Sequence, residues 1–123
     1  MNKKKTLVLG ASAKTNRYSN IAIHRLRGAG HPVEAIGLRP AEVADVQVHR
    51  KEEVILPEDI DTVTLYLNPV RQEAYKNMIL DLQPKRVIFN PGTENPVFER
   101  ELEDAGIQAL EACTLVMLST GQY

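Results

Sequence analysis

The sequence predicts an α/β fold in which helices cover both faces of a mainly parallel sheet. Short apolar runs rich in β-branched residues alternate with amphipathic stretches along the 123 residues, a pattern typical of a three-layer α/β/α sandwich. The chain is long enough for one domain with its own core, over residues 1–123, but too short for a cofactor domain plus a separate substrate domain. We therefore expect a single domain.

Six runs are expected to form strands, and the third is weak, so the sheet should have five or six strands. The runs at residues 62–67 and 87–89 are dense in β-branched, aromatic and other apolar side chains, as in strands covered on both faces. A helical turn is expected over residues 51–55. The predicted strands are 5–9, 33–36, 46–49, 62–67, 86–90 and 108–111.

Capping residues mark the starts of two helices. Asn68-Pro69 and Asn95-Pro96 each place an N-cap asparagine before a proline at the first helical position. Helical spacing then predicts the residues that share an apolar face. These are Ile21, Ala22, Leu26, Ala29 and the stem of Arg25 in the first helix, Val70, Ala74, Met78 and Leu82 in the second, and Phe98, Leu102 and Ala105 in the third.

The segment 6–19 has the order of strand, glycine, polar loop and helix that is found at the first phosphate loop of dinucleotide-binding proteins. Its apolar run ends at Gly10, and Ser12 and Thr15 stand where the usual motif has its second and third glycines. Backbone N–H groups and the positive end of a helix dipole converge on such a loop and favour an anion. The segment therefore predicts a Rossmann-like fold with a site for a nucleotide phosphate.

Polar side chains of this segment each have two interpretations. Lys14 and Arg17 either neutralise a pyrophosphate or are solvated loop charges. Ser12 and Thr15 either donate to phosphate or follow ordinary turn preferences. Ser19 or the next residue is expected to cap the following helix, and a cap at this terminus can also contact a ligand.

The end of the second strand lacks the acidic residue that holds the ribose 2′-hydroxyl in NAD sites. Arg39 stands there instead, followed by Pro40. A guanidinium matches phosphate as a bidentate partner, so Arg39 either binds a phosphorylated ribose or is a solvated surface residue. In the first case, the ligand is NADP, with its 2′-phosphate, or coenzyme A, with its 3′-phosphate.

Right-handed crossovers bring the carboxyl ends of all parallel strands to one edge of the sheet, where open α/β sheets bind ligands. The loops expected there are residues 10–19, 37–40, 67–69 and 90–96. The last loop holds Gly92 and two prolines. Either they shape a binding wall or they only make the loop rigid.

Composition argues against several classes of function. The net charge is −1 and tryptophan is absent, so neither nucleic acid nor a membrane surface is an expected partner. The single cysteine, Cys113, excludes an internal disulfide and fits a reducing compartment, by default the cytoplasm. We expect its thiol to be buried and inert, or else to lie near the ligand. No metal-ligand cluster, nucleophile elbow or paired histidine is visible.

The chain resembles the small bacterial CoA-binding domain proteins, stand-alone relatives of the N-terminal domain of the succinyl-CoA synthetase alpha subunit. The likeness runs through nearly the whole chain and lies in the order and spacing of its motifs. These are Val8-Leu9-Gly10-Ala11-Ser12 with Tyr18-Ser19-Asn20, Gly30-His31-Pro32-Val33 leading to Pro40, Leu67-Asn68-Pro69, Lys85-Arg86-Val87 leading to Gly92, and Ala105-Gly106-Ile107 leading to Cys113.

The resemblance implies that coenzyme A lies across the carboxyl ends of the strands. The loop at residues 10–14 would hold the pyrophosphate, and the end of the second strand would flank the adenosine. Two motifs depart from the family: Arg39-Pro40-Ala41 replaces the common Asn-Pro-Lys, and Asn90-Pro91-Gly92 replaces Gln-x-Gly. The expected contact residues are Gly10, Ala11, Ser12, Lys14, Tyr18, Ser19, Arg39, Pro40, Asn68, Pro69, Asn90 and Gly92.

The predicted function is non-catalytic binding of coenzyme A or an acyl-CoA. One alternative is a minimal NADP-dependent reductase completed by a homodimeric partner. Another is a regulatory interaction subunit with a vestigial nucleotide site and an unknown protein partner. A homodimer fits any of the three. If Cys113 lies near the pocket, its thiol is expected to form a mixed disulfide by exchange with oxidised CoA, which releases one reduced CoA.

Overall fold

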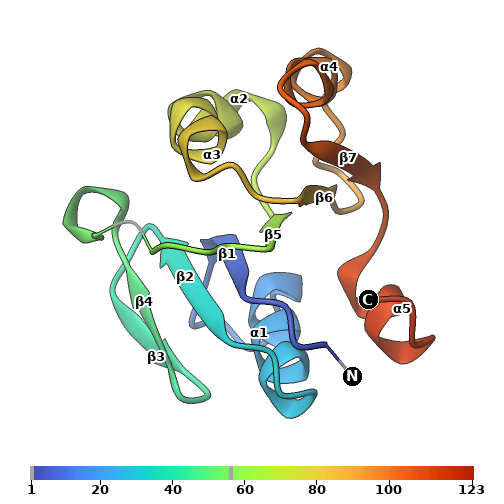
Figure 1. Cartoon of the computed structure of the whole chain (residues 1–123). Helices are drawn as coiled ribbons and strands as arrows, with labels where there is room; N and C mark the ends of the chain where they lie inside the picture. Colours follow the sequence, from blue (N-terminus) through green and yellow to red (C-terminus); the bar gives the residue numbers. More distant parts are fainter. Residues whose placement is uncertain (1, 56) are drawn as a thin grey trace.

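The structure is a computed structural model that describes residues 2–55 and 57–123. Within these residues the strands form one seven-stranded sheet in the order β3-β4-β2-β1-β5-β6-β7, and helices pack on both of its faces (Figure 1). The elements are β1 (Thr6–Ala11), α1 (Tyr18–Gly28), β2 (Val33–Gly37), β3 (Ala41–Val43), β4 (Val46–His49), η1 (Lys51–Glu53), β5 (Thr62–Leu65), α2 (Pro69–Gln72), η2 (Glu73–Tyr75), α3 (Lys76–Leu82), β6 (Arg86–Phe89), α4 (Pro96–Asp104), β7 (Gln108–Glu111) and α5 (Thr114–Ser119).

The predicted Rossmann-like sandwich is confirmed, with one strand more than the six expected. Every pairing is parallel except that of β3 with β4. The additional strand, β3, has three residues, of which only Val43 is buried. It turns into β4 at Ala44, whose φ is +55°, and Asp45 there forms a bidentate ion pair with Arg27 of α1. A strand this short has no readable alternation, which is why the sequence did not reveal it.

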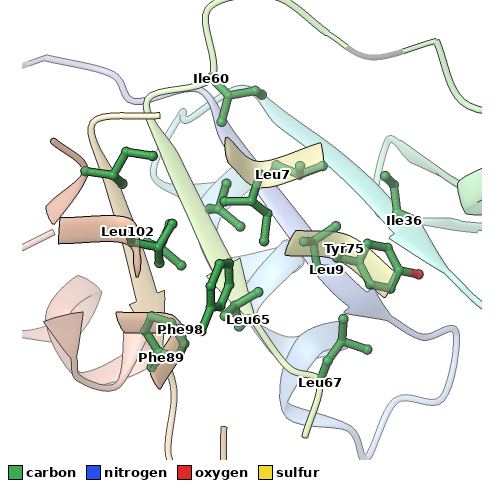
Figure 2. Packing of buried hydrophobic residues seen from close by; sticks show 14 residues of the cluster. Leu7, Leu9, Ile36, Ile60, Leu65, Leu67, Tyr75, Phe89, Phe98 and Leu102 are labelled. Atoms are coloured by element: carbon green, nitrogen blue, oxygen red, sulfur yellow. The ribbon is translucent and has the colours of Figure 1, made fainter. Parts of the chain in front are cut away.

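Alternate residues of the central strands face two apolar clusters, as a period of two requires. Leu7 and Leu9 of β1 face the side covered by α3 and α4, while Val8 faces the side covered by α1. Figure 2 shows the first cluster, in which Phe98 lies beside Leu65. The rings of Phe98 and Phe89 meet edge-on, with their centroids 5.9 Å apart. The two clusters therefore pack the sheet against α3 and α4 on one face and against α1 on the other.

The helix faces were predicted only in part. In α4, Phe98 and Leu102 are buried as expected, but Ala105 is exposed because it lies beyond the last helical residue. In α1 the face is rotated: Ile23 is buried, whereas Arg25 and Ala29 are exposed. The rotation follows from Ser19 and Asn20, two polar residues of the first turn that are buried.

The second predicted helix is interrupted, and its predicted face was wrong at Val70 and Ala74, which are exposed. Met78 and Leu82 do pack against the core, partly buried. A 3₁₀ turn, η2, separates α2 from α3 and changes the angular spacing of side chains. Val70 is 82% exposed, and the buried residues are Gln72, Tyr75 and Ile79 instead. The predicted helical turn after β4 is confirmed as the 3₁₀ helix η1.

Candidate ligand site at the carboxyl edge of the sheet

Strands β1, β2, β5 and β6 end in register and bring their following loops to one edge. Leu9 pairs with Leu65, and Leu65 pairs with Phe89, so the three strands end side by side. Ala11 pairs with Gly37 across a register shift in β1. The expectation that these loops meet at one edge is thus confirmed.

Two glycines let the backbones approach closely at this edge. Gly10 has φ +90°, and a Cβ there would lie 2.9 Å from the carbonyl oxygen of Tyr66. A Cβ on Gly37 would lie 2.2 Å from the carbonyl oxygen of Ala11. Gly10 was predicted as part of the site, whereas Gly37 was not singled out, although a glycine at a strand end is a signal of close backbone approach.

The β1–α1 loop is held by its own polar groups. The Ser12 hydroxyl accepts from the Lys14 N–H at 3.1 Å, and the Asn20 amide donates to the Ser12 carbonyl oxygen at 2.9 Å. The prediction that Ser19 or Asn20 caps α1 was wrong, because the helix begins at Tyr18 and its N-cap residue is Arg17. Asn20 instead ties the first turn of the helix back to the loop.

The predicted contact residues of β1 and α1 differ in exposure. Ala11 and Ser19 are buried, with 7% and 3% of their surface exposed, so they offer a ligand little contact area. Lys14 is exposed, and Tyr18 keeps 71% of its surface. The loop thus presents an exposed cation and an exposed aromatic ring beside the close backbone approach at Gly10.

The turn after β2 adds a further exposed cation at the same edge, beside the exposed Lys14 and Arg17 of the β1–α1 loop. Arg39 and Pro40 are exposed between β2 and β3, and the preceding Leu38 is 69% exposed. The pairing of Gly37 with Ala11 places this turn next to the β1–α1 loop. Lys14 and Arg39 therefore follow adjacent strand ends.

The loop after β5 has the predicted cap. The Asn68 side chain accepts from the Arg71 N–H at 2.9 Å, with Pro69 at the first helical position, and both residues are exposed at the edge. The corresponding cap on α4 is also confirmed, since Asn95 accepts from the Phe98 N–H at 3.2 Å.

Asn90 is buried and its side chain is fully used inside the protein. Its amide nitrogen donates to the Thr64 hydroxyl at 2.7 Å and to the Leu65 carbonyl oxygen at 2.9 Å. Its side-chain oxygen accepts from the Thr114 N–H at 2.8 Å. Asn90 therefore positions the loop, and the exposed Gly92, with φ +92°, lies at its surface.

Gln72 joins two of the loops and was missed by sequence reasoning. It is fully buried and donates to the carbonyl oxygens of Leu67, at 2.8 Å, and Thr93, at 2.7 Å. Its side-chain oxygen accepts from the Asn95 amide at 2.8 Å. Nothing in the sequence separates such a glutamine from a solvated one on the polar face of a helix.

Tyr66 follows β5 and turns its side chain towards the α1 side of the sheet. Its hydroxyl oxygen is buried, and within residues 2–55 and 57–123 it has no hydrogen-bond partner. Burial raises the pKa of Tyr66 to about 12, and the nearby Cys113 adds to the rise. Cys113 is half-buried, just before α5, which corrects the expectation of a fully buried thiol.

The edge is electrostatically asymmetric. Lys14 and Arg39 lie on the side of β1 and β2, whereas Glu99 and Glu111 lie on the side of β7. Glu99 raises the pKa of Glu111 through a hydrogen bond and charge repulsion, so these two carboxylates are close. An anionic ligand is therefore favoured over β1 and β2 rather than over β7.

The described residues give no sign of a metal site or a membrane span. Among residues 2–55 and 57–123, no group of three or more His, Cys, Asp or Glu side chains is placed to hold a metal ion. None of the helices in the same ranges has the length and apolar character needed to cross a membrane.

A model of the CoA-binding domain matches residues 4–119. The chain belongs to the CoA-binding domain family. Membership supports a CoA-binding role and agrees with the resemblance in the strand, glycine and loop motifs. A comparison with curated proteins finds no match.

Solved structures share the fold over almost the whole chain. A crystal structure of an uncharacterized protein is 48% identical, with a TM-score of 0.93 and 100% of both chains covered. A conserved hypothetical protein from Pyrococcus furiosus is 26% identical, with a TM-score of 0.78, covering 92% of this chain and 97% of that one. A hypothetical protein from Pyrococcus horikoshii is 24% identical, with a TM-score of 0.85 and coverage of 96% and 83%, and shows the fold alone.

Proposed function

We propose that this member of the CoA-binding domain family binds coenzyme A or an acyl-CoA at the carboxyl edge of β1, β2, β5 and β6, without catalysing a reaction itself. The family match over residues 4–119 carries the proposal. The close backbone approach at Gly10 and Gly37 holds the strand ends of this edge together, since a side chain at either position would collide with a neighbouring strand end. The cations at this edge support an anionic ligand.

In the proposed complex the pyrophosphate lies over the β1–α1 loop and the 3′-phosphate lies beside Arg39. Gly10, Ala11, Ser12 and Ser19 would contribute backbone groups, and Lys14 would supply charge. Tyr18 and Pro40 would flank the adenosine, while Asn68, Pro69 and Gly92 would line the pantetheine side. Asn90 would act indirectly, because its side chain is already satisfied within the protein.

A thermal-shift series on nucleotide-stripped protein tests this function. Coenzyme A, dephospho-CoA, NADPH and NADH are compared at saturating concentration. A ligand at about 100 times its Kd adds roughly 2.7 kcal/mol to stability, which raises the Tm of a domain this size by several degrees. We expect the largest shift with coenzyme A and a smaller one with dephospho-CoA.

The other ligands distinguish the alternatives. A shift with NADPH alone would replace the proposal by the NADP-dependent reductase, and turnover of a carbonyl substrate would then be sought. No shift with any of the four would leave a fold used for another purpose, such as a regulatory interaction subunit.

A further inference from the structure

The amino edge of the sheet, opposite to the proposed CoA site, carries an open surface pocket of about 490 Å³, called the cavity below. Four cationic residues line it: Lys3 and Lys4 before β1, and Lys85 and Arg86 at the start of β6. Asp61 is the one carboxylate in its lining. This concentration of positive charge occurs in a chain whose net charge is −1, so it is local rather than a property of the whole surface.

The guanidinium of Arg86 is held in place before any ligand arrives. Its Nε donates to the Thr62 hydroxyl and its Nη2 donates to the main-chain oxygen of Tyr123, the last residue, each at 2.8 Å. The group also stacks on the Tyr123 ring, 4.5 Å from the centroid. A fixed, partly buried guanidinium loses little conformational freedom on binding an anion.

Asp61 offsets only part of the positive charge of the cluster. One of its carboxylate oxygens accepts from the Thr62 hydroxyl at 2.7 Å. The other lies 3.7 Å from the Lys85 Nζ, and the Lys85 side chain is 85% exposed. This long ion pair leaves the Lys85 ammonium free to turn towards another acceptor.

His31 lies beside the cluster, and its pKa responds to the charges of the cluster. Burial lowers the pKa of His31, and Lys3, Lys4 and Arg86 lower it further, while Asp61 opposes them. The His31 Nδ1 accepts from the Lys4 N–H at 2.9 Å. The imidazole is thus rigidly placed within the positive potential.

We propose that this cavity is a second ligand site, which binds a small multivalent anion of the phosphate class. The Lys85 ammonium provides a mobile point charge, the Lys3 Nζ is already held by the Ala29 carbonyl oxygen at 2.6 Å, and Arg86 provides a fixed planar donor. A fixed guanidinium beside a mobile ammonium is suited to the several oxygens of a phosphate. The site lies at the opposite ends of the strands from the proposed CoA site and does not depend on it.

Pyrophosphate is the probe for this site, and binding is measured by calorimetry on the whole chain. Lys85→Glu removes one cation from the cavity and adds a carboxylate. Because the side chain is exposed, the fold is expected to survive. Arg100→Glu, at an exposed position on α4, is the matched control. We expect at least a tenfold weaker affinity in Lys85→Glu and an unchanged affinity in Arg100→Glu.

The His31 pKa, followed by NMR, separates this cavity from the loop at the other edge. Bound pyrophosphate offsets the cations, so we expect it to raise the pKa of His31, both in the native chain and in Lys14→Glu. The proposal is overturned if saturating pyrophosphate leaves that pKa unchanged, or if Lys85→Glu and Arg100→Glu bind pyrophosphate equally. Loss of all binding in Lys14→Glu would assign the anion to the β1–α1 loop and also overturn it.

Discussion

Arg39 is the residue on which the choice of ligand depends. Its exposed guanidinium follows β2, where an NAD site would need a carboxylate. We predict that Arg39→Ala weakens coenzyme A binding about tenfold, or about 1.4 kcal/mol, and leaves dephospho-CoA almost unaffected. Calorimetry with both ligands, with Arg100→Ala as the control, measures this. An equal loss for the two ligands would place the 3′-phosphate elsewhere.

His31 makes stability depend on pH in a defined direction. Its pKa is below the ordinary value of 6.5, because of burial and the cations around it. As the pH falls below about 6.5, the unfolded chain takes up a proton that the folded chain resists, so stability decreases towards the folded pKa. We predict that the native chain loses more stability than His31→Gln between pH 7.5 and pH 5.5. Urea unfolding measures the difference, and parallel losses would refute the assignment.

At the residue scale, the sequence predicted the local structure around the candidate site where short-range pattern carries the information. Gly10 and the two asparagine caps follow from spacing and turn chemistry, and the structure has them as expected. Gln72 and Asn90 illustrate the limit. Their amides are satisfied by groups distant in the sequence, and no local pattern shows that a polar side chain will be buried.

At the element scale, β1 and β2 require a glycine where they meet. We predict that Gly37→Ala destabilises the protein by about 1–3 kcal/mol, because its Cβ would overlap the Ala11 carbonyl oxygen. Gly28→Ala is the matched control. No atom lies within 4 Å of its Cβ position at the end of α1, so a small gain of about 0.5–1 kcal/mol is expected. Urea unfolding compares the two, and equal effects would contradict the close approach.

The same scale explains which elements could be predicted. The central strands were found because apolar residues fill both of their faces. Strand β3 escaped because three residues at a sheet edge carry too little pattern. The face of the second helix was wrong at Val70 and Ala74 because η2 shifts the register of the helix, and a 3₁₀ turn inside a helical stretch has no distinct signature in composition.

At the scale of the whole molecule, the parallel sheet separates two charged edges. The carboxyl edge gathers the loops that the family resemblance assigns to coenzyme A, and the amino edge gathers Lys3, Lys4, Lys85 and Arg86. Sequence order alone indicated the first, since strand direction determines where loops meet. The residues of the amino edge come from segments about 80 residues apart. They meet only in the folded chain, because β1, β5 and β6 pair in parallel and so begin at the same edge.

The most direct test of the central claim is a titration of isotope-labelled, nucleotide-stripped protein with coenzyme A, followed by the backbone amide signals. Our account predicts that the largest changes fall at residues 10–19, 37–40, 67–69 and 90–95, at the carboxyl edge, with saturation at one equivalent. Changes confined to residues 3–4, 61 and 85–86 at the amino edge, or no changes at all, would contradict the proposed CoA site.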